Sequence, residues 1–107
     1  MKKKLKIGAL DWDYDDCVTT KEMGDDLGIC EYEKLSIKIK GKLPENVKKV
    51  TIIHELLHGF FFAGGNAPKN EEDIVDLLAN QFVLFIQNNP NFFKKIFLYK
   101  KKKRKTL

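Results

Sequence analysis

The sequence predicts a single α+β domain, with short strands in its first 40 residues and helices after them. Apolar and polar residues alternate in the first part, whereas from about residue 44 onward the apolar residues recur at helical spacing. The chain has 107 residues, of which 43% are hydrophobic and 33% charged, a size and composition that suit one domain with one modest core. We expect a small twisted β-sheet packed on a helix, followed by a second helix and a short C-terminal helix.

The first strands are predicted from residue 5 onward. Residues 5–10 are mostly apolar, and Leu10, Trp12 and Tyr14 alternate with polar residues, which predicts one strand or two short ones. Residues 19–28 predict a loop, because they are rich in threonine, aspartate and glycine.

Another strand is predicted at residues 35–40, after a short apolar stretch at 29–32. Leu35, Ile37 and Ile39 alternate with polar residues, so one face of this strand is buried. Lysines occupy its other face, which places the strand at or near a sheet edge.

A long helix is predicted over residues 44–62. Pro44 suits a first helical turn, and Glu45 lies where its charge interacts favourably with the helix dipole. Gly64 and Gly65 end the helix.

A second helix is predicted to begin near Asn70, a good N-cap, and to stop at Asn88-Asn89-Pro90. A third, shorter helix is predicted over residues 91–103. The apolar residues of the second helix that we expect to point inward are Ile74, Val75, Leu77, Leu78, Phe82, Phe85 and Ile86.

The long helix contains the only two histidines of the chain, in the sequence His54-Glu55-Leu56-Leu57-His58. Residues i and i+4 lie on one helical face, so both imidazoles can bind one ion, as in the HExxH zinc motif. Glu55 lies about 100° around the helix, where it can act as a general base beside the metal. A chance meeting of these residues is disfavoured, because burying them in so apolar a helix without a partner is costly.

A catalytic zinc usually has three protein ligands, so one more is required. No third histidine exists, and the acidic start of the second helix offers Glu71 and Glu72. The helical wheel slightly favours Glu71 as the more inward of the two, and the spacing leaves the choice open.

The HExxH motif followed by Glu72-Asp73-Ile74-Val75-Asp76 resembles the gluzincin pattern, HExxH and then ExxxD. More closely, residues 5–93 resemble small phage and prophage HExxH proteins, relatives of the ImmA/IrrE-type metallopeptidases. The resemblance implies a zincin-like fold, with Glu72 as the third zinc ligand and Asp76 buttressing a zinc-bound histidine.

The resemblance also implies zinc-dependent peptide hydrolysis. Zinc on His54, His58 and Glu72 would activate a water, and Glu55 would pass its proton to the leaving amine. The peptide or protein substrate would lie along the strand at residues 35–40. No downstream histidine or tyrosine matches the oxyanion-binding residue of longer gluzincins, which leaves Tyr14, Tyr32 and Tyr99 as candidates. A catalytically weak or inactive metal-stabilised binding protein is the alternative.

The positive charge is concentrated at the C-terminal end. The net charge is +5, yet residues 1–76 carry 12 basic and 15 acidic residues, and no acidic residue follows Asp76. We interpret residues 1–99 as the metallopeptidase domain and residues 100–107 as a basic tail, through which nucleic acid could bind. The oligomeric state is left open.

The acidic residues at 11–16 and the two cysteines are weaker indications of function. The acidic residues Asp11, Asp13 and Asp15 have the spacing of an EF-hand calcium loop, but Asp16 occupies the position that requires glycine. Cys17 and Cys30 have no CxxC spacing, so we expect reduced thiols. No apolar stretch is long enough for a membrane span and no leader is evident, which favours a cytoplasmic protein without a membrane partner.

Overall fold

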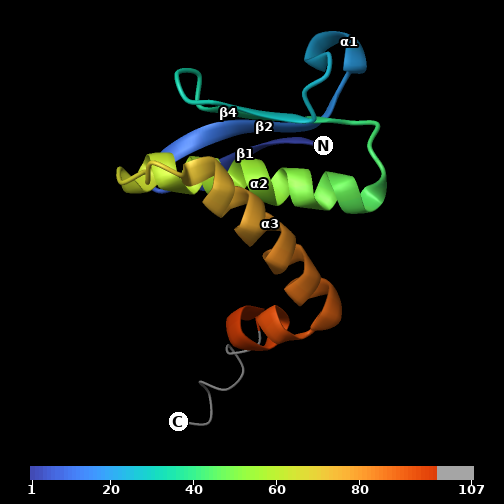
Figure 1. Cartoon of the computed structure of the whole chain (residues 1–107), viewed down its shortest axis with the longest axis vertical. Helices are drawn as coiled ribbons and strands as arrows, with labels where there is room; N and C mark the ends of the chain where they lie inside the picture. Colours follow the sequence, from blue (N-terminus) through green and yellow to red (C-terminus); the bar gives the residue numbers. More distant parts are fainter. Residues whose placement is uncertain (99–107) are drawn as a thin grey trace.

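A computed structural model describes residues 1–98, and the predictions that fall on residues 99–107, including the basic tail, lie outside it. Within the described part the fold is α+β, as predicted, with a four-stranded mixed sheet on one side of the helix α2, Glu45–Gly64 (Figure 1). The helix α3, Glu71–Asn88, crosses the other side of α2. No helix in residues 1–98 is both long enough and apolar enough to cross a membrane.

The sheet has the strand order β1-β2-β4-β3. The strands β1, Lys2–Ile7, and β2, Leu10–Val18, form an antiparallel hairpin, and β3, Gly28–Glu31, and β4, Ser36–Lys40, form another. Parallel pairing between β2 and β4 joins the two hairpins. The outer strands of the sheet are therefore β1 and β3.

Residues 35–40 lie near a sheet edge, as predicted, but β4 is not the edge strand itself, because it pairs with β2 on one side and with β3 on the other. Its lysines lie on a face of the sheet, not on an edge: Lys38 bonds Glu22 at 3.0 Å and lies 3.5 Å from Glu31. Glu22 belongs to α1, Thr20–Met23, a short helix within the predicted loop, capped by the side chain of Thr19.

The acidic residues of β2 form ion pairs with the lysines of β1. Lys4 lies 2.7 Å from Asp13, and the pairs Lys6–Asp11 and Lys2–Asp15 lie at 3.4 and 3.9 Å. These carboxylates project from one face of an extended strand, so they do not form an EF-hand loop. The opposite face of β2 is buried and carries Trp12 and Tyr14.

The helix α2 is apolar on two sides because it packs in two directions. Ile52 and Leu56 face the sheet core, which includes Trp12, Ile37 and Ile39. Leu57 faces α3, where it contacts Val75 and Ala79. A side chain of α2 that lies between these two faces is therefore within reach of both the sheet and α3.

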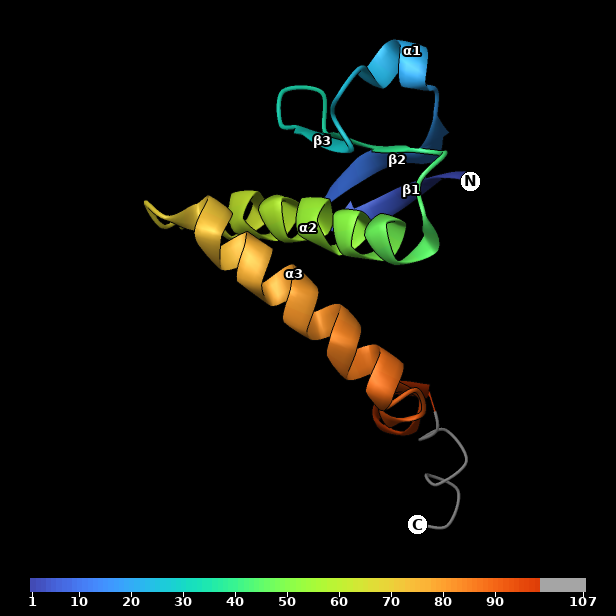
Figure 2. The same ribbon diagram turned by 45° about the vertical axis from the view of Figure 1, so that its right-hand side comes forward.

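The helix α3 begins and ends as predicted, with Asn70 at its N-cap and Asn89 at its C-cap. Its inward face agrees with the prediction only at Val75, which is buried, and at Ile74, which is half-buried. The buried residues are Val75, Ala79 and Val83, spaced by four, whereas Leu77, Leu78, Phe82, Phe85 and Ile86 are exposed. The reason is that α3 contacts α2 along one stripe and then runs away from the sheet (Figure 2). Beyond it, the described part of the predicted third helix is a π-helical segment, η1, Lys94–Leu98.

Candidate metal centre

Two histidines in the middle of α2 define the candidate site. His54 and His58 lie one turn apart, and their rings are 4.9 Å apart between centroids at an interplanar angle of 72°. The helix that presents them begins after Pro44 and ends at Gly65, whose left-handed backbone (φ 69°) lets its N–H bond the carbonyls of Phe61 and Phe62.

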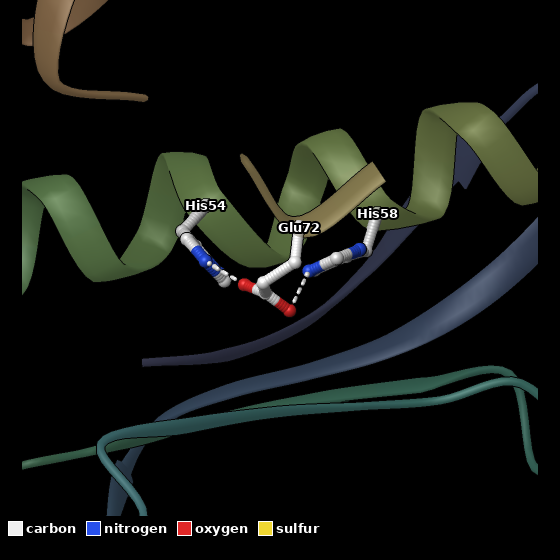
Figure 3. A group of neighbouring side chains, drawn as sticks. All are labelled: His54, His58 and Glu72. Carbon is white, nitrogen blue, oxygen red and sulfur yellow. Dashed lines mark ion pairs between the residues drawn. The ribbon is translucent and has the colours of Figure 1, made fainter. Parts of the chain in front are cut away.

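The first turn of α3 brings Glu72 to the two histidines. Figure 3 shows its carboxylate between the two rings: one oxygen lies 2.7 Å from His54 Nε2, and the other lies 3.4 Å from His58 Nε2. One potential ligand atom from each of the three side chains lies within 4.8 Å of the other two. These three residues are those that the gluzincin resemblance implied as ligands.

Glu71 contacts the other nitrogen of His58. Its Oε2 lies 2.5 Å from His58 Nδ1, on the side of the ring away from Glu72. The side chain of Glu71 is 19% exposed and that of Glu72 is 65% exposed, so Glu71 is the more inward of the two, as the helical wheel indicated. Glu71 is thus the more buried glutamate, whereas Glu72 is the one whose carboxylate lies between the two histidine rings. The sequence spacing alone did not make this distinction.

Asp76 lies near His54, 22 residues away in the sequence. Its Oδ1 is 2.9 Å from His54 Nε2, the same nitrogen that Glu72 approaches. An outer hydrogen bond that orients a metal-bound histidine goes to the nitrogen that does not bind the metal. Here that nitrogen, Nδ1, faces Glu55, so the buttressing role of Asp76 stays a prediction.

Glu55 belongs to α2 and is buried where the start of β3 approaches the helix. Its Oε2 lies 3.2 Å from His54 Nδ1. Burial raises the pKa of the Glu55 carboxyl, although His54 and His58 lower it in part. Burial lowers the pKa of His54, but Glu55 and Glu72 together outweigh it, so that the His54 pKa is raised above its usual value.

The donor set fits zinc. Two imidazole nitrogens and one carboxylate oxygen converge, which is the three-ligand set of catalytic zinc sites that keep a further position open. The carboxylate of Glu72 already lies between the two Nε2 atoms, so small side-chain movements would bring all three donors around one ion.

The site opens into a cavity of about 440 Å³ beside β3. A second cavity, of about 560 Å³, extends along the first half of α2 and meets the first at Gly28, His54 and Glu55. The first cavity is lined by Asp26, Gly28, Ile29, Cys30, Tyr32, His54, Glu55, His58 and Glu72.

Sequence reasoning did not connect Gly28 or Cys30 with the site. A Cβ at Gly28 would lie 2.7 Å from Thr51 Cγ2 and 2.9 Å from Glu55 Cγ, so glycine allows β3 to approach the helix closely. Cys30 is half-buried, and burial, with Glu55 and Glu71 nearby, raises the pKa of its thiol to about 12. In the sequence, the only sign of this close approach was a single glycine at the start of a short strand.

The three tyrosines named from the sequence have different surroundings. Tyr14 is buried and donates a hydrogen bond to Asp16 at 3.1 Å, and it does not line the first cavity. Tyr32 lines that cavity and stacks on Phe62 with ring centroids 5.0 Å apart. Burial raises the pKa of Tyr32 to about 12, so its hydroxyl remains a donor at neutral pH. Tyr99 lies outside the described residues.

No family model, curated protein or solved structure matches the chain. The case for a function therefore rests on the side chains at the site.

Proposed function

We propose that this protein is a zinc-dependent peptidase of zincin-like architecture. One observation carries the proposal: His54, His58 and Glu72 converge beside the buried carboxylate of Glu55, in a cavity bordered by a sheet edge. Glu55 lines the same cavity as the three candidate ligands, and peptide hydrolysis requires a base beside the metal.

His54, His58 and Glu72 would hold the ion. A zinc ion there would supply Lewis acidity, which lowers the pKa of water toward 7 and polarises a peptide carbonyl. Glu71, on the Nδ1 of His58, would keep that ring's Nε2 lone pair directed at the metal position.

Glu55 would move the proton. The raised pKa of its carboxyl brings it closer to neutrality, where a group can both accept a proton and release it. The side chain lines both cavities, so it can reach the two sides of a peptide bond held between them. We assign Glu55 the role of taking a proton from the attacking water and giving it to the leaving amine.

The strand β3 replaces residues 35–40 as the proposed site of peptide binding. It is the outer strand beside the metal position, and Gly28, Ile29 and Cys30 line the cavity. A peptide could add to this edge through main-chain hydrogen bonds. Tyr32, which follows β3, is the candidate to donate a hydrogen bond to the developing oxyanion.

The substitution Glu55→Gln tests the proposal. It removes the base and leaves the three zinc ligands in place, so zinc content should be unchanged, while the cleavage rate should fall by about 10²- to 10⁴-fold. The measurement is mass-spectrometric digestion of a peptide library with zinc-loaded protein, beside metal analysis of each variant.

Glu45→Gln is the matched control, because Glu45 is an exposed glutamate in the first turn of the same helix. It should cleave at the wild-type rate. Equal cleavage by wild type and Glu55→Gln would exclude Glu55 as the base. Zinc-loaded wild type that cleaves no peptide in the library would favour the metal-stabilised binding protein.

A further inference from the structure

The far half of α3 presents an uncovered apolar surface. Both ribbon views show the helix leaving α2 and running away from the sheet, with η1 at its end (Figures 1 and 2). Val75, Ala79 and Val83 make the buried stripe on α3. We define the outer surface of α3 as Leu77, Leu78, Phe82, Leu84, Phe85 and Phe92, each between 40% and 61% exposed.

The size of this surface is that of a functional patch. Six large side chains that are about half exposed present roughly 500 Å² of apolar area, taking 150–200 Å² for each whole side chain. The largest apolar patch on a typical soluble monomer has about this size and is often an interaction site.

Ring contacts fix the shape of the surface. Phe85 lies edge-on to Phe92 with ring centroids 5.6 Å apart, and Phe82 lies 6.1 Å from Phe93. Phe92 and Phe93 in turn contact each other at 5.4 Å. These contacts hold the chain after Pro90 against the end of α3, yet they leave Phe82, Phe85 and Phe92 exposed. The surface is therefore formed before any partner binds, which limits the entropic cost of binding.

The charges around the surface are divided between its two ends. Residues 77–93 contain no charged side chain. The first turn of α3 is acidic, with Glu71, Glu72 and Asp73, whereas Lys94 and Lys95 follow the uncharged stretch. The surface is thus acidic at one end, apolar in the middle and basic at the other end.

We propose that the outer surface of α3 binds a second copy of this chain, with the two α3 helices antiparallel. Overlap of residues 77–88, the part of this uncharged stretch that belongs to α3, with the same residues of the second copy places the two-fold axis near Phe82. Lys94 and Lys95 of each copy then lie against the acidic first turn of the other. A parallel arrangement would bring like charges together at both ends. One self-complementary patch used twice is the usual form of a two-fold interface.

Two other ways of covering the surface fit the sequence less well. Residues 99–107 contain only Tyr99 and Leu107 as large apolar residues, beside five lysines and an arginine, so they lack the apolar groups needed. A helix that lies on an anionic lipid surface carries cations along its own polar face, and residues 77–93 carry none.

The first test measures self-association by sedimentation velocity up to about 100 µM protein, a range that detects micromolar dimers. We expect a dimer. The double substitution Leu77→Glu and Leu84→Glu should weaken it by at least about 100-fold, because two exposed leucines are replaced by charges. Leu10→Glu is the matched control, since Leu10 is similarly exposed but belongs to β2, and it should leave the dimer intact.

The second test addresses orientation through charge. Lys94→Glu with Lys95→Glu should weaken the dimer at low salt by about 10-fold, and adding Asp73→Lys should restore part of the affinity. Circular dichroism checks that each variant is folded. A dimer that is unaffected by the leucine substitutions would overturn the proposed interface. If Asp73→Lys did not restore affinity to the Lys94→Glu and Lys95→Glu variant, the antiparallel arrangement would be overturned. A monomer that sediments with phosphatidylserine vesicles would assign the surface to lipid instead.

Discussion

Glu71 and Glu72 are neighbours on α3, yet they point in different directions from the helix and contact different atoms of the histidines. Successive residues point about 100° apart on a helix, so Glu72 faces the Nε2 atoms of both histidines while Glu71 reaches the back of His58. The first position suits a metal ligand and the second an outer hydrogen-bond acceptor. Exchanging the two side chains' environments would require turning the whole helix.

We expect Glu72→Ala to weaken zinc binding more than Glu71→Gln does. Loss of an outer hydrogen-bond partner typically lowers metal affinity by about 10- to 100-fold, and loss of a direct ligand should exceed that. Competition titration against a chromophoric chelator measures both. Asp73→Asn, next in sequence, should bind as wild type. If Glu72→Ala kept its zinc while Glu71→Gln lost it, the two roles would be reversed.

The sequence was sufficient to propose His54, Glu55 and His58, because the HExxH spacing depends only on helical geometry, whereas Glu72 was implied by the resemblance to gluzincins. The contact of Glu71 with Nδ1 could not be predicted, because it depends on how the chain turns between Gly65 and Asn70. The approach of Gly28 to Glu55 depends on how β3 pairs with β4 and how β4 pairs with the distant strand β2.

The strand β3 can lie beside the candidate metal site because it contains a glycine. Gly28 lies where the strand passes closest to α2, against Thr51 and Glu55. The lysines of residues 35–40 could not distinguish the edge strand from its neighbour, because Lys38 is held by Glu22 and Glu31 across a sheet face. The long helix was predicted correctly to within about two residues, since its own residues set its ends.

We expect Gly28→Ala to destabilise the fold by about 1–3 kcal/mol, the usual cost of forcing an extra carbon into a packed site. The methyl group would meet Thr51 Cγ2 at 2.7 Å, so strand or helix must shift. Urea unfolding followed by circular dichroism measures the change. Gly64→Ala is the control, because nothing lies within 4 Å of its Cβ position, and it should be neutral or slightly stabilising. A stability of Gly28→Ala equal to that of wild type would show that β3 does not need this close approach.

Across the whole molecule, α2 connects the two layers and also carries the histidines. The sheet core lies on one side of it and the contact with α3 on the other. An ion held between α2 and Glu72 would therefore tie α3 to the rest of the fold. The α+β class was predictable from the alternation pattern, but the single stripe of contact along α3 was not, because that helix is apolar on most of its sides.

We expect zinc to raise the melting temperature of the chain. Zinc at a hundred times its Kd adds about 2.7 kcal/mol to the folded state, or about 10–20 °C for a domain of this size. Thermal unfolding with zinc and with excess chelator measures the shift, and Glu55→Gln should show the same shift because its ligands are intact. Identical melting temperatures in the two conditions would argue against a metal bound between α2 and α3.

The parallel pairing of β2 with β4 also bears on the order in which the chain assembles. Each hairpin closes between near neighbours in sequence, but Asp13 pairs with Ser36 and Tyr14 with Ile37 across the intervening α1 and β3. Long-range closures cost more entropy and form more slowly than local ones. We expect the two hairpins to arise early and to join late. Since β3 is attached to the sheet only through β4, the cavity beside the histidines would then be among the last parts of the molecule to exist.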